Sequence, residues 1–150
     1  MNKSGSEILL NPGPVNLSQR VREALSGKDV CHRELEFAEL VQHINKRLGE
    51  VYSGLSSCNY RSVLLTASGT GAVEAMLTTF IPKDSTTLVI DNGVYGARME
   101  RILKASNRDY KILKFDWEKP IDVDLIDKKL SECQEIENLV LVHHETTTGR

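Results

Sequence analysis

The sequence has few of the features that mark secreted or membrane-bound proteins. Its three cysteines, at positions 31, 58 and 133, are odd in number and widely spaced, which is typical of reduced thiols in the cytoplasm. No apolar run approaches the roughly 18 residues that a membrane-spanning helix needs. The first residues reach only a short apolar stretch before Asn11 and Pro12, which does not fit a signal peptide. We therefore expect a cytoplasmic protein.

An excess of charge of one sign is also missing. Nineteen lysines and arginines stand against 21 aspartates and glutamates, which gives a net charge of −2. This balance argues against an electrostatic nucleic-acid binder and against a polybasic membrane-surface protein. We expect neither a nucleic acid nor a membrane as a partner.

Hydrophobic periodicity predicts an α/β fold. Short apolar runs predict four strands, at residues 62–67, 86–90, 111–115 and 138–143. Apolar residues three or four positions apart predict helices at 18–25, 34–52, 70–80, 94–105 and 123–133. Strands that alternate with helices indicate a mostly parallel sheet with helices on both faces. Because Arg150 comes just after the fourth predicted strand, we expect the domain to be incomplete.

The segment 67–72, Ala-Ser-Gly-Thr-Gly-Ala, joins a predicted strand to a predicted helix. Small residues there expose backbone N–H groups at a helix N-terminus, where an anion such as a phosphate is favoured. Ser68 and Thr70 add hydroxyl groups. An ordinary strand-to-helix turn with a capping hydroxyl is the alternative interpretation.

A dinucleotide site is a second alternative for the same turn. Gly69, Gly71 and Asp91 imitate its fingerprint, with the acid placed for a ribose hydroxyl. The third glycine of that fingerprint would fall at position 74, which is Glu74. A long acidic side chain beside a pyrophosphate contradicts the mechanism, so the sequence disfavours this alternative.

Two further motifs follow predicted strands, and so fall at the carboxyl edge of the sheet, where ligands bind in open α/β folds. Tyr95 lies between two glycines in the segment 91–98, which suits an aromatic face for a planar cofactor. A tyrosine packed in a loop is the alternative, and the more common role of such a residue. The segment 143–149, His-His-Glu-Thr-Thr-Thr-Gly, supplies hydroxyls. Adjacent histidines on a strand point to opposite faces, so we expect no metal site there.

Other reactive residues suggest no role. Cys31 and His32 are adjacent, whereas a catalytic cysteine and histidine normally meet in space rather than in sequence. We expect His43 on a helix surface and Trp117 in packing.

Together, the segments 68–72, 92–98 and 144–149 resemble the large-domain motifs of class V aminotransferases, which are pyridoxal-phosphate enzymes of fold type I. The segments 11–15 and 31–37 fit the same family, and the resemblance covers about residues 8–150. Leu35 departs from it, since relatives often carry proline there. By this resemblance, residues 1–60 form an N-terminal loop and helical segment on the substrate-pocket and dimer-interface side. Residues 61–150 form an incomplete cofactor-binding large domain.

The resemblance implies a role for eight residues. Three would hold the phosphate of pyridoxal 5′-phosphate, one would stack on its ring, one would bind its phenolic oxygen, and three would border the substrate pocket. They are, in that order, Ser68, Gly69 and Thr70; Tyr95; Thr146; and Pro12, Gly13 and Pro14.

The implied activity is transamination by a homodimer, with a small amino donor and a 2-oxo acid as substrates. The motifs are most similar to those of members that transfer the amino group of 2-aminoethylphosphonate to pyruvate, giving phosphonoacetaldehyde and alanine. The branch that uses alanine or serine with glyoxylate or pyruvate is a close alternative. The family's Schiff-base lysine, ring-nitrogen aspartate and anion-binding arginine would all follow residue 150. We therefore expect these 150 residues alone to be inactive, with no catalytic residue among them. A dinucleotide-binding module and a non-catalytic remnant remain as alternatives.

Overall fold

The computed structural model describes residues 8–10, 13–51 and 61–149. The chain divides into two compact units, one formed by Met1–Asn16 with Ala67–Arg150 and the other by Leu17–Thr66. These bounds differ from the expected division into residues 1–60 and 61–150. The expected division refers to the domains of the full-length family members, and it stays a prediction.

The unit Leu17–Thr66 contains two helices, α1 (Gln19–Ala24) and α2 (Leu35–Gly49), close to the predicted bounds. Ser18 caps α1 by accepting a hydrogen bond from the Val21 amide on its side-chain oxygen. No residue of either helix is buried.

The strand predicted over residues 62–67 is wrong. Residues 61–65 have no regular structure, and the Val63 side chain is 80% exposed. An apolar run becomes a strand only when a neighbouring strand pairs with its backbone groups. The three described strands pair with one another and not with this segment.

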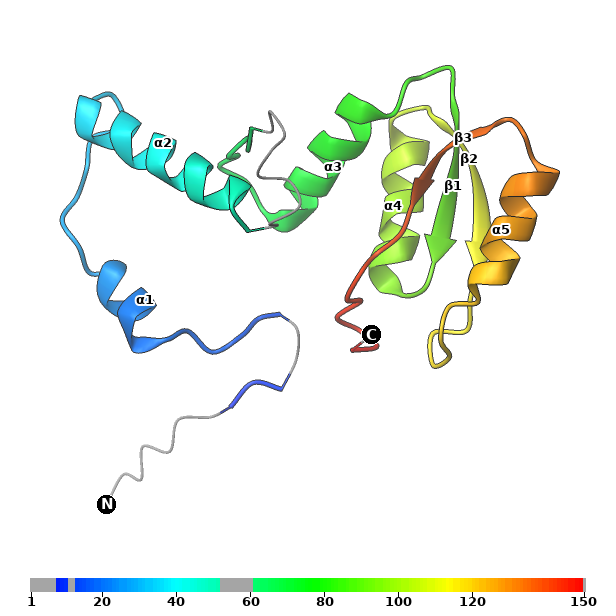
Figure 1. Ribbon diagram of the computed structural model, residues 1–150, viewed down its shortest axis with the longest axis horizontal. Helices are drawn as coiled ribbons and strands as arrows, with labels where there is room; N and C mark the ends of the chain where they lie inside the picture. The colour runs from blue at the N-terminus through cyan, green and yellow to red at the C-terminus, as the bar shows by residue number, and fades with distance from the viewer. Residues whose placement is uncertain (1–7, 11–12, 52–60, 150) are drawn as a thin grey trace. The chain divides into compact units, whose positions relative to one another are not determined.

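The other unit is built on a three-stranded parallel sheet (Figure 1). Its strands are β1 (Thr86–Asp91), β2 (Asp109–Lys114) and β3 (Ile136–Val140), in the order β2-β1-β3. Its helices are α3 (Gly69–Phe80), α4 (Val94–Ala105) and α5 (Val123–Glu132). The alternation of helix and strand and the parallel pairing confirm the predicted α/β class.

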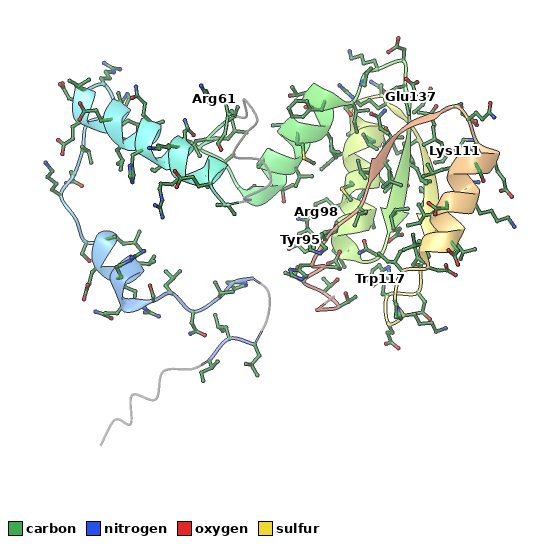
Figure 2. The ribbon with its side chains drawn as sticks, in the orientation of Figure 1. Arg61, Tyr95, Arg98, Lys111, Trp117 and Glu137 are labelled. Carbon is green, nitrogen blue, oxygen red and sulfur yellow. The ribbon has the colours of Figure 1, made fainter. Side chains whose placement is uncertain are left out.

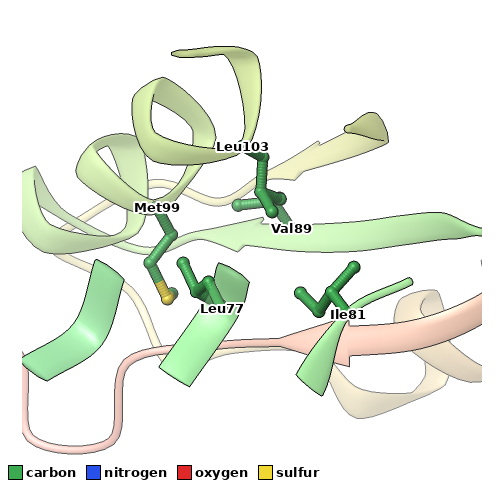
Figure 3. Close-up of a cluster of buried hydrophobic side chains, with 5 residues drawn as sticks. All are labelled: Leu77, Ile81, Val89, Met99 and Leu103. Carbon is green, nitrogen blue, oxygen red and sulfur yellow. The ribbon is translucent and has the colours of Figure 1, made fainter. Parts of the chain in front are cut away.

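Alternation along β1 gives the sheet two buried faces. Val89 points to one side and belongs to a cluster of buried apolar side chains (Figure 3). The other members are Leu77 of α3, Ile81 just after α3, and Met99 and Leu103 of α4. Leu88 and Ile90 point to the other side and pack with Ile126 of α5. Because both faces of the central strand are covered, its middle residues Leu88, Val89 and Ile90 are consecutive apolar residues and do not alternate with polar ones.

Gly96 lets α4 approach the end of β1. A side chain at this position would place its Cβ 2.8 Å from the backbone oxygen of Ile90. The close approach fixes the first turn of α4 over the carboxyl edge of the sheet.

Among the described residues, every helix is too short or too polar to span a membrane.

Candidate cofactor site at the carboxyl edge of the sheet

The N-terminus of α3 presents free backbone donors. Ser68 precedes the helix in an extended conformation, and its hydroxyl oxygen accepts a hydrogen bond from the Gly71 amide at 3.3 Å. This bond satisfies one of the first-turn amides. Within the described residues the Gly69 and Thr70 amides have no hydrogen-bond partner. A helix end with free N–H groups favours a bound anion.

The first turn of α4 carries an aromatic ring and a cation beside this helix end. Tyr95 is 39% exposed, and the Arg98 guanidinium carbon lies 4.6 Å from the centroid of its ring (Figure 2). Arg98 also donates a hydrogen bond from Nη1 to Oγ1 of Thr70 at 2.9 Å. The guanidinium therefore connects the start of α4 to the first turn of α3.

A buried carboxylate fastens the segment after β3 to the same edge. Glu145 is completely buried, and its Oε2 accepts the Tyr95 amide at 3.0 Å. Its Oε1 accepts both the backbone N–H of Thr147, at 3.1 Å, and the Thr147 hydroxyl, at 2.7 Å. These bonds hold Thr146 between fixed neighbours.

A second link joins the same two segments. The side-chain amide of Asn92 donates to the backbone oxygen of Val142 at 2.9 Å. The ends of β1 and β3 are thus tied by side chains as well as by the sheet.

These elements border one cavity of about 730 Å³. The sequence-predicted residues among its lining are Gly13, Pro14, Ser68, Gly69, Thr70, Tyr95 and Thr146. Pro12, the eighth, lies outside the described residues. Cavities of this size are typical of small-molecule and cofactor sites. The chemistry of the lining fits a phosphorylated aromatic group, because helix-end amides, one guanidinium and an aromatic face meet there.

The two histidines do not lie on a strand, contrary to expectation. β3 ends at Val140, before His143, and His144 has a φ of 63°. This turn stacks the two imidazole rings with their centroids 4.6 Å apart instead of sending them to opposite faces. In the part of the chain that the structure describes, no three side chains of histidine, cysteine, aspartate or glutamate gather as metal ligands.

Asp91 does not present its carboxylate as a dinucleotide site would require. It is 7% exposed, and its Oδ1 accepts a hydrogen bond from the Trp117 indole at 3.3 Å. Trp117 is 41% exposed and belongs to neither buried cluster, so the structure shows this polar contact for it in place of the expected packing.

Sequence reasoning missed the parts played by Arg98 and Glu145. Arg98 follows Tyr95 by three residues on a predicted helix, and this spacing alone places the two side chains on one face. Glu145 lies in the segment 143–149, for which the sequence predicts only a supply of hydroxyl groups. Nothing local in the sequence indicates that it reaches Tyr95, 50 positions away.

Comparison with solved structures defines the class of fold. The chain superimposes on the aspartate aminotransferase of subgroup IV from Thermus thermophilus with a TM-score of 0.81 and 26% sequence identity. The match covers 95% of this chain and 38% of that enzyme. The α/β unit described above is therefore an aminotransferase fold.

Sequence relatives narrow the class further. The chain is 38% identical, over 95% of its length, to the bifunctional phosphonoacetaldehyde hydrolase/aminoethylphosphonate transaminase of Clostridioides difficile, of which it covers 22%. It is 37% identical to the 2-aminoethylphosphonate–pyruvate transaminase of Bacteroides fragilis, again over 95% of the chain and 39% of that protein. The chain is thus a relative of these transaminases and spans well under half of their length. No family model matches it.

Proposed function

We propose that the chain is part of a class V, pyridoxal 5′-phosphate-dependent aminotransferase that transfers the amino group of 2-aminoethylphosphonate to pyruvate. The products would be phosphonoacetaldehyde and alanine. The names and similarity of the relatives support this assignment. The observation that carries it is the single cavity on which the α3 N-terminus, the Tyr95 ring and Thr146 converge. We further propose a cytoplasmic homodimer.

Each part of the cavity has a chemical task in this proposal. The Gly69 and Thr70 amides, with the Thr70 hydroxyl, would donate hydrogen bonds to phosphate oxygens. The Tyr95 ring would support one face of the pyridine ring. The Thr146 hydroxyl would donate to the phenolic oxygen and so fix the rotation of the ring about its phosphate arm. When bound, the cofactor supplies an electron sink for the transfer of the amino group.

Glu145 would hold the residues of the cavity wall in place and would not contact the substrates. Its carboxylate holds the Tyr95 amide and the Thr147 backbone, so the aromatic support and the threonine segment keep a fixed separation. Preorganisation of this kind lowers the cost of orienting a ligand. The proposal assigns the Schiff-base lysine, the ring-nitrogen aspartate and the anion-binding arginine to sequence after residue 150.

The test is a binding titration of the 150-residue chain with pyridoxamine 5′-phosphate, pyridoxamine and NAD. Pyridoxamine compounds lack the aldehyde that would react unselectively with the ten lysines of the chain. We expect saturable binding of the phosphorylated compound, much weaker binding of pyridoxamine and none of NAD. Binding of NAD without binding of pyridoxamine 5′-phosphate would favour the dinucleotide module and overturn the proposal.

A second measurement addresses the reaction itself. A longer chain that continues past residue 150 is expected to form alanine from pyruvate with 2-aminoethylphosphonate as donor. The comparison is the same chain with alanine or serine as amino donor and glyoxylate as acceptor. Faster reaction with these substrates would assign the chain to the alanine/serine–glyoxylate branch of the class. No transamination with either set of substrates would favour a non-catalytic remnant.

A further inference from the structure

Arg98 has three contacts of different kinds at the candidate site. Its guanidinium covers one face of the Tyr95 ring, its Nη1 donates to the Thr70 hydroxyl oxygen, and its side chain lines the cavity. Among the described residues it makes no salt bridge with a carboxylate. Its positive charge is therefore left uncompensated next to the free amides of α3.

The hydrogen bond to Thr70 determines which way that hydroxyl acts. A threonine hydroxyl has one proton to donate and two lone pairs, and its proton rotates to suit its neighbours. A guanidinium can only donate, so Arg98 occupies a lone pair of Oγ1 and leaves the proton free. Within the described residues that proton meets no acceptor. The hydroxyl is therefore prepared to donate to an oxygen atom in the cavity.

The contact with Tyr95 orients the ring. A cation over an aromatic face is attracted by the quadrupole of the ring. Because the guanidinium occupies one face, only the opposite face can support a planar ligand. One side chain thus fixes both the aromatic support and the hydroxyl of the helix end.

We infer that Arg98 is a positioning residue that gives the cavity its preference for a phosphorylated over an unphosphorylated ligand, acting through the Thr70 hydroxyl. This inference rests on the proposed function, since it takes the anion at α3 to be the phosphate of the cofactor. It requires the effect of Arg98 on phosphate binding to depend on Thr70.

The experiment measures the affinities of pyridoxamine 5′-phosphate and pyridoxamine for the 150-residue chain and its variants. The ratio of the two affinities isolates recognition of the phosphate, and the affinity of pyridoxamine reports on the ring alone. Arg98→Met is expected to lower the ratio about tenfold, the scale of one lost charge-assisted hydrogen bond. Arg98→Lys, which keeps the charge without the planar fork, is expected to recover part of it.

Arg101→Met is the matched control. Arg101 is an exposed arginine one turn further along α4, and the substitution removes the same charge from the same helix. It is expected to leave the ratio unchanged. An equal fall with Arg101→Met would show a general effect of net charge and overturn the inference.

A double-mutant cycle tests the route through Thr70. In a Thr70→Val background, Arg98→Met is expected to lower the ratio by far less than tenfold, because the hydroxyl it orients is gone. Additive losses would overturn the inference, as would an unchanged ratio in Arg98→Met. If Arg98→Met does not fold, Arg98→Lys takes its place in the cycle. Failure of the unsubstituted chain to bind pyridoxamine 5′-phosphate would instead overturn the proposed function, and the inference with it.

Discussion

The carboxyl group of Glu145 fills the space that a side chain at Gly93 would need. A Cβ built on Gly93 would overlap the Cγ, Cδ and Oε2 atoms of Glu145. The same Oε2 atom accepts the Tyr95 amide, two residues after the glycine. The absence of a side chain at Gly93 therefore allows the segment after β3 to reach the start of α4 and complete the cavity wall.

Gly93→Ala should separate these two segments. The new methyl group cannot fit without moving the buried Glu145, so we expect a loss of about 1–3 kcal/mol in the free energy of unfolding. Thermal or urea unfolding of the chain measures it. Gly49→Ala is the matched control, because a Cβ there meets nothing within 4 Å and lies at the end of α2. That change is expected to be neutral or slightly stabilising. Equal effects of the two substitutions would contradict the overlap.

Glu145→Gln tests the hydrogen bonds and leaves the shape almost unchanged. The carboxylate accepts three hydrogen bonds, whereas the amide would turn an NH₂ group toward either the Tyr95 or the Thr147 donors. A buried donor without an acceptor costs about 1–3 kcal/mol, and we expect that decrease in unfolding free energy. Glu118→Gln, at an exposed position, should change it by less than about 0.5 kcal/mol. If the two variants unfold alike, the buried carboxylate has no special role.

Tyr95→Ala should weaken binding of pyridoxamine 5′-phosphate about tenfold, because the planar ligand loses its aromatic support. Tyr95→Phe keeps the ring and should stay within about twofold of the unsubstituted chain, since the ring and not the phenol hydroxyl would contact the ligand. Equilibrium dialysis measures both affinities. A loss with Tyr95→Phe as large as with Tyr95→Ala would assign the interaction to the hydroxyl and not to stacking.

The sequence predicts most of the elements because their periodicity is local. The helices at 69–80 and 94–105 and the strand at 86–91 have the bounds expected to within one residue. The meeting of the segments around Tyr95 and Thr146 was also predictable, because each follows a strand and the carboxyl ends of parallel strands meet at one edge of a sheet. The position of Thr70 beside them does not follow in this way, because the strand expected before it is absent from the described residues.

What the sequence does not reveal depends on contacts between distant residues. The run at 62–67 has the composition of a strand, but a strand needs a partner that no local pattern identifies. The bond between Glu145 and Tyr95 and the stacking of His143 on His144 arise from the path of the chain after β3. Such arrangements appear only when the elements are packed together.

Arg108 provides a test of how α3 is held. It is 8% exposed and donates from Nε to the backbone oxygen of Ile81, at 2.9 Å, and from Nη2 to that of Thr78, at 2.5 Å. These are carbonyl groups at the C-terminal end of α3, which helix bonding leaves free. Arg108→Met should lower the free energy of unfolding by about 2–3 kcal/mol, measured by urea unfolding, because charged hydrogen bonds are lost and buried carbonyls remain unpaired. Arg101→Met, at an exposed position, should have little effect, and a similar loss there would contradict this reasoning.

The pair formed by Lys111 and Glu135 should give the chain a measurable pH dependence. The Lys111 ammonium donates to Oε1 of Glu135 at 2.5 Å, and this hydrogen bond is the main cause that lowers the pKa of Glu135 below its ordinary 4.5. The same bond is the main cause that raises the pKa of Lys111 above its ordinary 10.5. A carboxyl group with a lowered pKa stabilises the fold above its ordinary pKa and loses this contribution as the pH falls through its folded value. A lysine with a raised pKa stabilises below its ordinary pKa and loses the contribution as the pH rises through its folded value.

Lys111→Met should therefore lower the melting temperature by a nearly constant amount between pH 5.5 and pH 9. This range lies about one pH unit or more above the ordinary pKa of glutamate and below that of lysine. The difference from the unsubstituted chain should shrink as the pH falls below 4.5. The effect is expected to be small, because both side chains are substantially exposed and salt screens them. Lys83→Met, which removes an exposed lysine without an ion pair among the described residues, should show no such change across acidic pH. If the difference for Lys111→Met stays constant down to pH 2, the hydrogen bond to Glu135 does not contribute to stability, and the lost contact is apolar packing of the lysine stem.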